Sequence, residues 1–253
     1  MNEILLMASG LAVLSVASGL LGLGVAFAAV PFLGLFLHDL VHEVQPLSLF
    51  LNGITAFFSL LGFARSGLVH WRPAILLAIV TTLTAPLGAW RAQLVEARWL
   101  WAFYFAAVAF LAWRMFQPET PGTAAQDEPD LKRALLLAVP ISVAAGMLGV
   151  GPGFLLLPTL ILVGFDPKRA AAVNALAVTP PSFSALLPHL GTMTVDLRAA
   201  AVLVVVGAAG SFIGARITSL YVPAARLKQA FGVLIVVMTA YKLLQLLFAP
   251  TVP

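Results

Sequence analysis

The sequence predicts an all-α polytopic membrane protein made of two repeats of four hydrophobic segments. Composition is the first reason: 61% of the 253 residues are hydrophobic and only 9% are charged, whereas a soluble domain carries about 25% charged residues. The second is that charge-free stretches recur at the length of a membrane crossing. The third is a glycine- and proline-containing segment that occurs twice, 127 residues apart.

Several functional classes are excluded or disfavoured by residue content. The chain has no cysteine, which excludes disulfides, thiolate nucleophiles and cysteine metal sites. The pI of about 9.9 arises from cations spread singly between apolar runs, so we expect loop charges and no nucleic-acid partner. The first apolar run has no basic region before it, so we do not expect a cleaved signal peptide. No hydrolase, metalloprotease or P-loop motif occurs, so we expect neither an enzyme nor a cofactor.

The charge-free stretches define the segments in chain order. They are residues 4–38, 44–64, 73–90, 99–113, 134–165, 170–195, 199–215 and 229–241. A spanning helix needs about 20 residues, but the first and fifth stretches have 35 and 32 and would be about 50 Å long as straight helices. Each contains a glycine cluster followed by a proline. We therefore predict that both are broken, either into two half-helices or into a re-entrant hairpin.

The two halves of the chain resemble each other in sequence. Residues 18–33 align with 145–160 at a constant offset of 127, and seven of the sixteen positions are identical. Between the halves, residues 117–130 contain three prolines and no large aliphatic side chain, a composition typical of a loop. We predict a first transmembrane repeat at 1–116, a cytoplasmic linker at 117–131 and a second repeat at 132–253.

Loop charges favour an inverted arrangement of the repeats. If all eight segments crossed once, seven cations would lie on each side of the membrane. If the two long segments return to the side they entered, the split becomes ten against four, which satisfies the positive-inside rule. The repeats are then inverted, with both chain ends outside and the linker inside, as in many secondary transporters.

The glycine clusters are the first candidate substrate-binding residues. They comprise Gly22 and Gly24 in one half and Gly149, Gly151 and Gly153 in the other. A half-helix starting after them would offer free N–H groups and the positive end of its dipole to an anion. A β-carbon at Gly151 or Gly153 would fill the anion's space or strain a backbone with positive φ. Pro31 and Pro158 are the predicted hinges. The alternative is that the glycines serve only close helix packing.

Polar side chains at membrane depth are the second group of candidates. Asn52 and Asn174 lie at equivalent positions, and Thr55, Thr179 and Ser182 lie nearby. Asparagine amides could complete the coordination of an oxyanion, or they could simply bond between helices. We interpret Thr81, Thr82, Thr84 and Ser211 as packing residues.

Ionisable groups are nearly absent from the middle of the segments. Arg91 and Arg216 each follow a Gly-Ala pair at a segment end and are interpreted as interfacial anchors. His38 and His42 are four residues apart, a spacing that would suit a metal carrier. The second half has no matching histidine, so we predict no metal site.

The duplicated G-x-x-G-x-G-x-x-F-x-x-x-P segment, Gly19 to Pro31 and Gly146 to Pro158, resembles the signature of the sulfite exporter TauE/SafE family (DUF81, toluene sulfonate uptake permeases). The resemblance extends over essentially the whole chain. It implies a multi-pass bacterial inner-membrane carrier of small oxyanions, sulfite or an organosulfonate. The first copy has Val25 and Ala26 where the second has Pro152 and Gly153, which favours the second as a site.

Three functions stay open at this point. The first is the oxyanion carrier, the second an accessory membrane subunit without transport, and the third the metal carrier using His38 and His42. Besides its anion, the carrier would have the lipid bilayer as partner, and the sequence leaves a homodimer open.

Overall fold

The computed structural model describes residues 2–37, 39–91, 106, 110, 113, 129–148, 151–227, 229–230, 232–233 and 237. Every regular element in these residues is helical, which confirms the predicted all-α class. The predicted segments 99–113 and 229–241 lie outside the described residues, apart from a few single positions.

The α-helices follow the same order in each half: a long helix, a short helix and two long helices. The first half contains α1 (Asn2–Leu21), α2 (Ala26–Leu33), a π-helical turn (Leu40–Val44), α3 (Gln45–Ala64) and α4 (Trp71–Arg91). The second contains α6 (Leu131–Leu148), α7 (Gly153–Leu162), α8 (Pro167–Leu186), a 3-10 turn (Leu187–His189) and α9 (Leu197–Leu220). The starts of α2 and α7 are 127 residues apart, the offset of the sequence repeat.

Both over-long segments are broken, as predicted. In the first, α1 ends at Leu21 and α2 begins at Ala26, and Gly22 and Gly24 have φ of 63° and 72°. Residues with a β-carbon rarely adopt this left-handed conformation, so the glycines allow the turn. With 8 and 10 residues, α2 and α7 are about 12 and 15 Å long, half of a 30 Å hydrocarbon core. Whether either segment is re-entrant stays open.

Aspartates start three helices of the second half, α6, α8 and α9. Asp130 accepts a hydrogen bond from Arg133 N (3.0 Å), Asp166 from Lys168 N (3.0 Å) and Asp196 from Arg198 N (2.9 Å). These carboxylates satisfy N–H groups that have no partner within the helix. Because Asp130 caps α6, this helix begins at Leu131, the last residue of the predicted linker.

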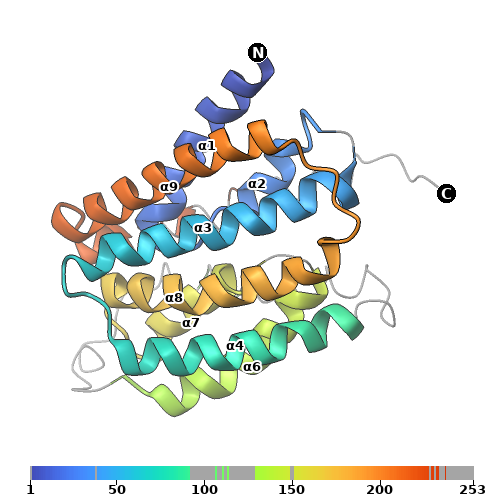
Figure 1. Cartoon of the computed structure of the whole chain (residues 1–253). Coiled ribbons are helices and arrows are strands. Elements are labelled where there is room, and N and C mark those ends of the chain that lie inside the picture. The colour runs from blue at the N-terminus through green and yellow to red at the C-terminus, as the bar shows by residue number, and fades with distance from the viewer. Residues whose placement is uncertain are drawn as a thin grey trace.

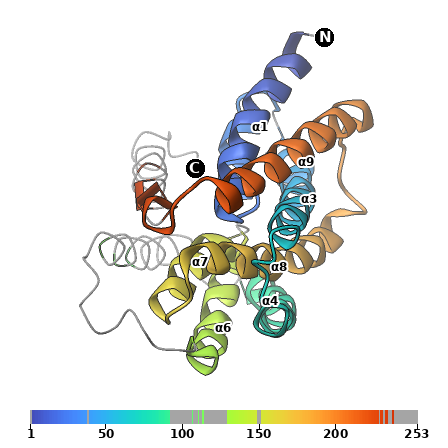
Figure 2. The same cartoon turned by 90° about the vertical axis from the view of Figure 1, so that its left-hand side faces the viewer.

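The helices pack in a continuous row (Figures 1 and 2). The closely packed pairs are α1 with α9, α9 with α3, α3 with α8, α8 with α4, and α4 with α6. The counterparts in the two halves are α1 and α6, α3 and α8, and α4 and α9. Exchanging each helix for its counterpart gives the same set of pairs. It also means that α9 packs against the first half and α4 against the second, so the halves are interlocked around a shared core.

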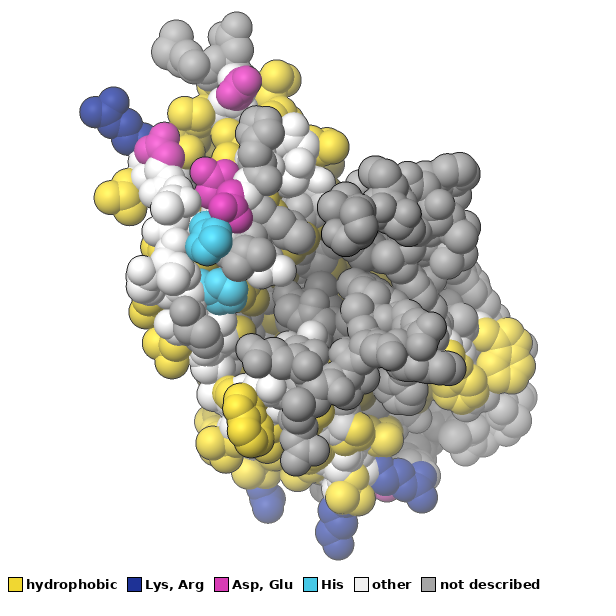
Figure 3. Space-filling model, turned by 90° about the vertical axis from the view of Figure 1, so that its right-hand side faces the viewer, with side chains coloured by type: hydrophobic (Ala, Val, Ile, Leu, Met, Phe, Trp, Pro, Cys, Tyr) yellow, Lys and Arg dark blue, Asp and Glu magenta, His cyan; other side chains and the backbone are white. Residues whose placement is uncertain are grey.

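Four described helical stretches are long and apolar enough to cross a membrane: Glu3–Leu21, His42–Ala64, Trp71–Gly88 and Leu197–Leu220. Helix α8 is outside this group although it lies at the centre of the row. Its residues from Ala170 to Ala175 are almost completely buried by protein, so it does not need the hydropathy of a lipid-facing helix. The visible charged side chains gather mainly towards the two ends of the molecule in Figure 3.

Candidate functional site

The two breaks meet at Asn52, which lies in α3 and is 1% exposed. Its Oδ1 accepts a hydrogen bond from Ala26 N (2.8 Å), and its Nδ2 donates to Ser182 Oγ in α8 (2.8 Å). Gly24 faces the same amide so closely that a β-carbon would overlap it, and a β-carbon at Gly151 would lie 2.8 Å from Nδ2. The breaks of both halves therefore contact the same side chain, that of Asn52.

Asn174, the equivalent residue of α8, also contacts both breaks, through different bonds. Asn52 and Asn174 are each the eighth residue of a 20-residue helix. Asn174 Nδ2 donates to Gly22 O (2.9 Å), and a β-carbon at Gly153 would lie 3.0 Å from this nitrogen. The same β-carbon would lie 3.0 Å from Leu23 O. We call this meeting point, formed by the four glycines Gly22, Gly24, Gly151 and Gly153 around the two asparagines, the glycine junction.

The two helix starts at the junction differ in how they are capped. At α2, Ala26 N donates to Asn52, and Val25 N donates to Thr55 Oγ1 (3.1 Å). At α7, the N-cap residue is Pro152, which has no N–H and makes no side-chain cap. Asn174 Oδ1, the counterpart of the capping oxygen in α3, is buried and has no partner among the described residues.

The orientation of the Asn174 amide follows from its neighbour. The carbonyl of Gly22 can only accept a hydrogen bond, so the amide nitrogen must face it and Oδ1 must point elsewhere. A buried acceptor without a donor costs free energy, of the order of 1–3 kcal/mol. The junction thus contains one polar atom whose partner the described protein does not supply.

The remaining predicted site residues are distributed as follows. Ser182 is in the junction, since its Oγ accepts from Asn52 and donates to Val178 O (2.7 Å). Thr179 bonds within its own helix, to Ala175 O (2.8 Å). Gly149 lies outside the described residues. Pro31 and Pro158 lie inside α2 and α7, so the interruptions occur at the glycines, several residues earlier, and the predicted hinge role of these prolines stays untested.

The glycines and asparagines also show the packing and interhelical bonding that the sequence left open as alternative roles. Gly19 packs against the backbone of Ser211, and Gly146 against that of Ala85, which is the close helix packing expected of small residues. Gly151 and Gly153 do not have positive φ, so a β-carbon there would be opposed by lack of space and not by backbone strain. Both asparagines do bond between separate elements.

Two residues of the junction were not predicted. Ser18 is fully buried, and its Oγ donates to Gly24 O, which fixes the turn between α1 and α2. Val178 fills the space beside Gly153, where a β-carbon would lie 2.6 Å from its Cγ2. A serine directly before the first glycine of the repeat was a signal for the former. Nothing in the sequence distinguished Val178 from other apolar residues.

The other polar predictions fall away from the junction. Thr81 Oγ1 donates to Ala177 O (2.8 Å) and Ser211 Oγ to Ser15 O (3.1 Å), bonds between packed helices. His42 Nδ1 pairs with Asp39 Oδ2 at 2.8 Å, while His38 lies outside the described residues. No group of three metal-ligating side chains occurs among the residues that the structure describes.

Apolar helices long enough to span a membrane and two broken segments are typical of polytopic membrane transporters. The family model described as "Sulfite exporter TauE/SafE" matches residues 6–242. The chain belongs to this family and is a multi-pass membrane transporter, as the sequence predicted.

Two relatives are similar along most of their length. Both are described as "Probable membrane transporter protein", from Xylella fastidiosa strains Temecula1 and 9a5c. They are 27% and 26% identical over 233 residues, which cover 89% of this chain and 89% of each relative. No solved structure matches the chain.

Proposed function

We propose that the protein carries a small oxyanion, sulfite or an organosulfonate, and that the anion binds at the glycine junction against the start of α7. The observation that carries this proposal is Asn174 Oδ1, which is buried and has no partner among the described residues, beside a helix start whose N-cap residue, Pro152, makes no side-chain cap. A helix N-terminus stabilises negative charge through its N–H groups and dipole, and therefore needs no buried cation.

The capping difference assigns different roles to the two half-helices. The first N–H groups of α2 are already occupied by Asn52 and Thr55, so that helix start holds the junction together. At the start of α7 the corresponding asparagine oxygen, Asn174 Oδ1, holds no N–H group of the described residues, so we assign the ligand to this end. The second glycine segment is therefore the substrate segment, in agreement with the preference drawn from Pro152 and Gly153.

The amide of Asn174 favours an anion that also carries a hydroxyl group. One of its N–H groups bonds Gly22 O, so the second N–H can donate to the ligand while Oδ1 can only accept. Hydrogensulfite has both accepting oxygens and one O–H, whereas an ionised organosulfonate has no O–H. Together with the family's description as sulfite exporters, this chemistry supports hydrogensulfite as the bound form.

Calorimetric titration of the purified protein with sulfite and with methanesulfonate tests the proposal. We expect Asn174→Leu to weaken sulfite binding about ten- to a hundred-fold, since a charge-assisted hydrogen bond contributes about 1.5–3 kcal/mol. Thr159→Val is the matched control because Thr159 is buried in α7 and, among the described residues, its hydroxyl bonds only Leu155 O in its own helix. Sulfite binding should also strengthen as the pH falls through the second pKa of sulfurous acid.

Two results would contradict the proposal. The first is unchanged sulfite binding by Asn174→Leu in a folded protein. The second is loss of binding on Arg114→Gln, because Arg114 is predicted at a segment end and would then hold the anion by side-chain charge at the interface. If methanesulfonate binds as tightly as sulfite at every pH, the assignment of hydrogensulfite as the bound form is wrong, but the anion site itself is not contradicted.

A further inference from the structure

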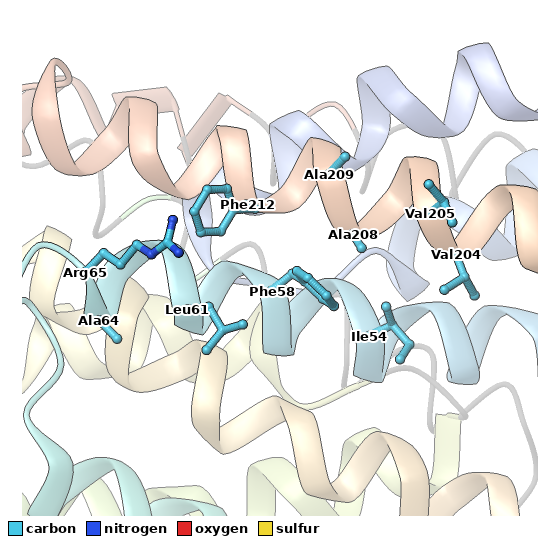
Figure 4. A pocket seen from close by; sticks show the side chains of 10 residues that line it. All are labelled: Ile54, Phe58, Leu61, Ala64, Arg65, Val204, Val205, Ala208, Ala209 and Phe212. Atoms are coloured by element: carbon cyan, nitrogen blue, oxygen red, sulfur yellow. The ribbon is translucent and has the colours of Figure 1, made fainter.

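An apolar groove runs along the outside of the α3–α9 pair, from Ile54, two residues after Asn52, to Arg65 at the end of α3. Its volume is about 760 Å³, and nine of its ten lining residues are hydrophobic. Figure 4 shows Phe58 and Leu61 on α3 opposite Ala208 and Phe212 on α9, with Arg65 at one end. The small side chains of Ala208 and Ala209 leave the space between the larger ones.

The groove opens towards the hydrocarbon of the bilayer. Both α3 and α9 belong to the stretches long and apolar enough to span a membrane. Of the lining residues, Leu61 and Val205 are 38% and 68% exposed. Deeper in the pair, Gly62 packs directly against Ala215, so the two helices are in contact beneath the groove and it is a surface feature.

The cationic end of the groove lies where the membrane-spanning stretch of α3 stops. That stretch ends at Ala64, and the exposed Arg65 follows it, its guanidinium 5.1 Å from the centre of the Phe212 ring. One helical turn further along α9, Arg216 Nη1 donates to Ser66 Oγ (2.7 Å). Neither arginine forms an ion pair with a carboxylate of the described residues.

The length of the groove matches one lipid leaflet. From Ile54 to Arg65 there are eleven residue steps along α3, or about 16 Å at 1.5 Å per residue. Half of a hydrocarbon core of about 30 Å is about 15 Å. An acyl chain could therefore lie in the groove while its headgroup sits beside Arg65, and guanidinium groups bind phosphate through paired hydrogen bonds.

We propose that this groove is a binding site for one anionic phospholipid, with an acyl chain between α3 and α9 and its phosphate at Arg65 and Arg216. The charge of the groove end selects the headgroup, since the only charged lining residue is basic. Basic pockets between transmembrane helices recognise anionic headgroups in this way. The groove shares no lining residue with the glycine junction, and the proposal does not depend on the anion that the protein carries.

Native mass spectrometry of the delipidated full-length protein, titrated with phosphatidylglycerol or phosphatidylcholine, tests this site. We expect one phosphatidylglycerol to bind about five- to ten-fold more tightly than phosphatidylcholine. Arg65→Gln should remove this preference, and Ala209→Phe, which fills the groove from an exposed position, should weaken both lipids. The controls are Arg72→Gln, an exposed arginine on α4, and Leu83→Phe, a 69% exposed position on the same helix.

Three outcomes would overturn the lipid site. Equal binding of the two lipids by the wild-type protein would remove the role of the arginines. Equal losses in the α4 controls would show a general surface effect. A lipid-free dimer that Ala209→Phe dissociates would show that a second copy of the chain covers the groove.

Discussion

Gly24 and Gly67 offer a matched pair for measuring what the glycine junction contributes to stability. Both have positive φ, 72° and 68°. A β-carbon at Gly67 would meet nothing within 4 Å, whereas a β-carbon at Gly24 would overlap the amide oxygen of Asn52. The substitutions Gly24→Ala and Gly67→Ala therefore impose similar backbone strain but differ in their effect on Asn52.

The expected difference can be worked out from the bonds of Asn52. The left-handed conformation costs an alanine roughly 1–2 kcal/mol at either position. At Gly24 the amide must also move, which breaks its 2.8 Å bonds to Ala26 N and Ser182 Oγ. Interhelical hydrogen bonds in membranes contribute about 0.6–1.7 kcal/mol each, and a buried group left unpaired costs about 1–3 kcal/mol. Gly24→Ala should therefore lose about 2–4 kcal/mol more than Gly67→Ala.

Reversible unfolding in mixed micelles of a mild detergent and dodecyl sulfate gives the two free energies. Asn52→Leu, which removes the amide without adding backbone strain, should lose a similar 2–4 kcal/mol. Equal losses in Gly24→Ala and Gly67→Ala would refute the reasoning, because the strain term alone would then account for both. So would an Asn52→Leu protein as stable as the wild type.

Three further results are expected. Gly151→Val should abolish most anion binding while the protein still inserts and purifies, because its side chain displaces the Asn52 amide (a β-carbon would lie 2.8 Å from Nδ2); normal affinity in calorimetry would contradict this. Thr81→Val should lower the free energy of unfolding by about 0.5–1.5 kcal/mol by removing the bond to Ala177 O between α4 and α8, and Thr84→Val, which loses only a bond within α4, should cost less. A reporter after Pro253 should be periplasmic and a tag at Thr123 cytoplasmic; the same side for both would reject the inverted topology.

Much of the architecture could be predicted from hydropathy and the internal repeat. Segments of 35 and 32 residues, as straight helices, exceed the thickness of a bilayer, and the glycine clusters in their middle mark places where the backbone can turn. The start of α7 at Gly153 follows from the 127-residue offset once α2 is placed at Ala26. Helix starts at Asp166 and Asp196 follow from capping chemistry.

The interlocking of the halves could not be predicted in the same way. Which helix packs beside which depends on contacts between residues far apart in the chain, such as Gly88 against Val143 and Gly214 against Val16. These glycines lie in different repeats from one another yet play the same role. The sequence shows that such residues permit close approach, but not which neighbour they approach.

The candidate site was predicted by residue type but not by role. Asn52 and Asn174 look equivalent in the sequence, and both are the eighth residue of their helices. Only the structure shows that Asn52 caps α2 while the oxygen of Asn174 has no partner. The difference arises because Asn52 lies beside the N–H of Ala26 whereas Asn174 lies beside the carbonyl of Gly22, an arrangement that a one-dimensional pattern does not contain.

The most direct test of the proposed site is a crystal of the protein soaked with selenite, the heavier analogue of sulfite, and measured at the selenium absorption edge. We predict an anomalous peak at the glycine junction, within hydrogen-bond distance of the first N–H groups of α7 and of Asn174, and its loss in Asn174→Leu crystals. A peak beside an arginine at a segment end, with none at the junction, would contradict the account.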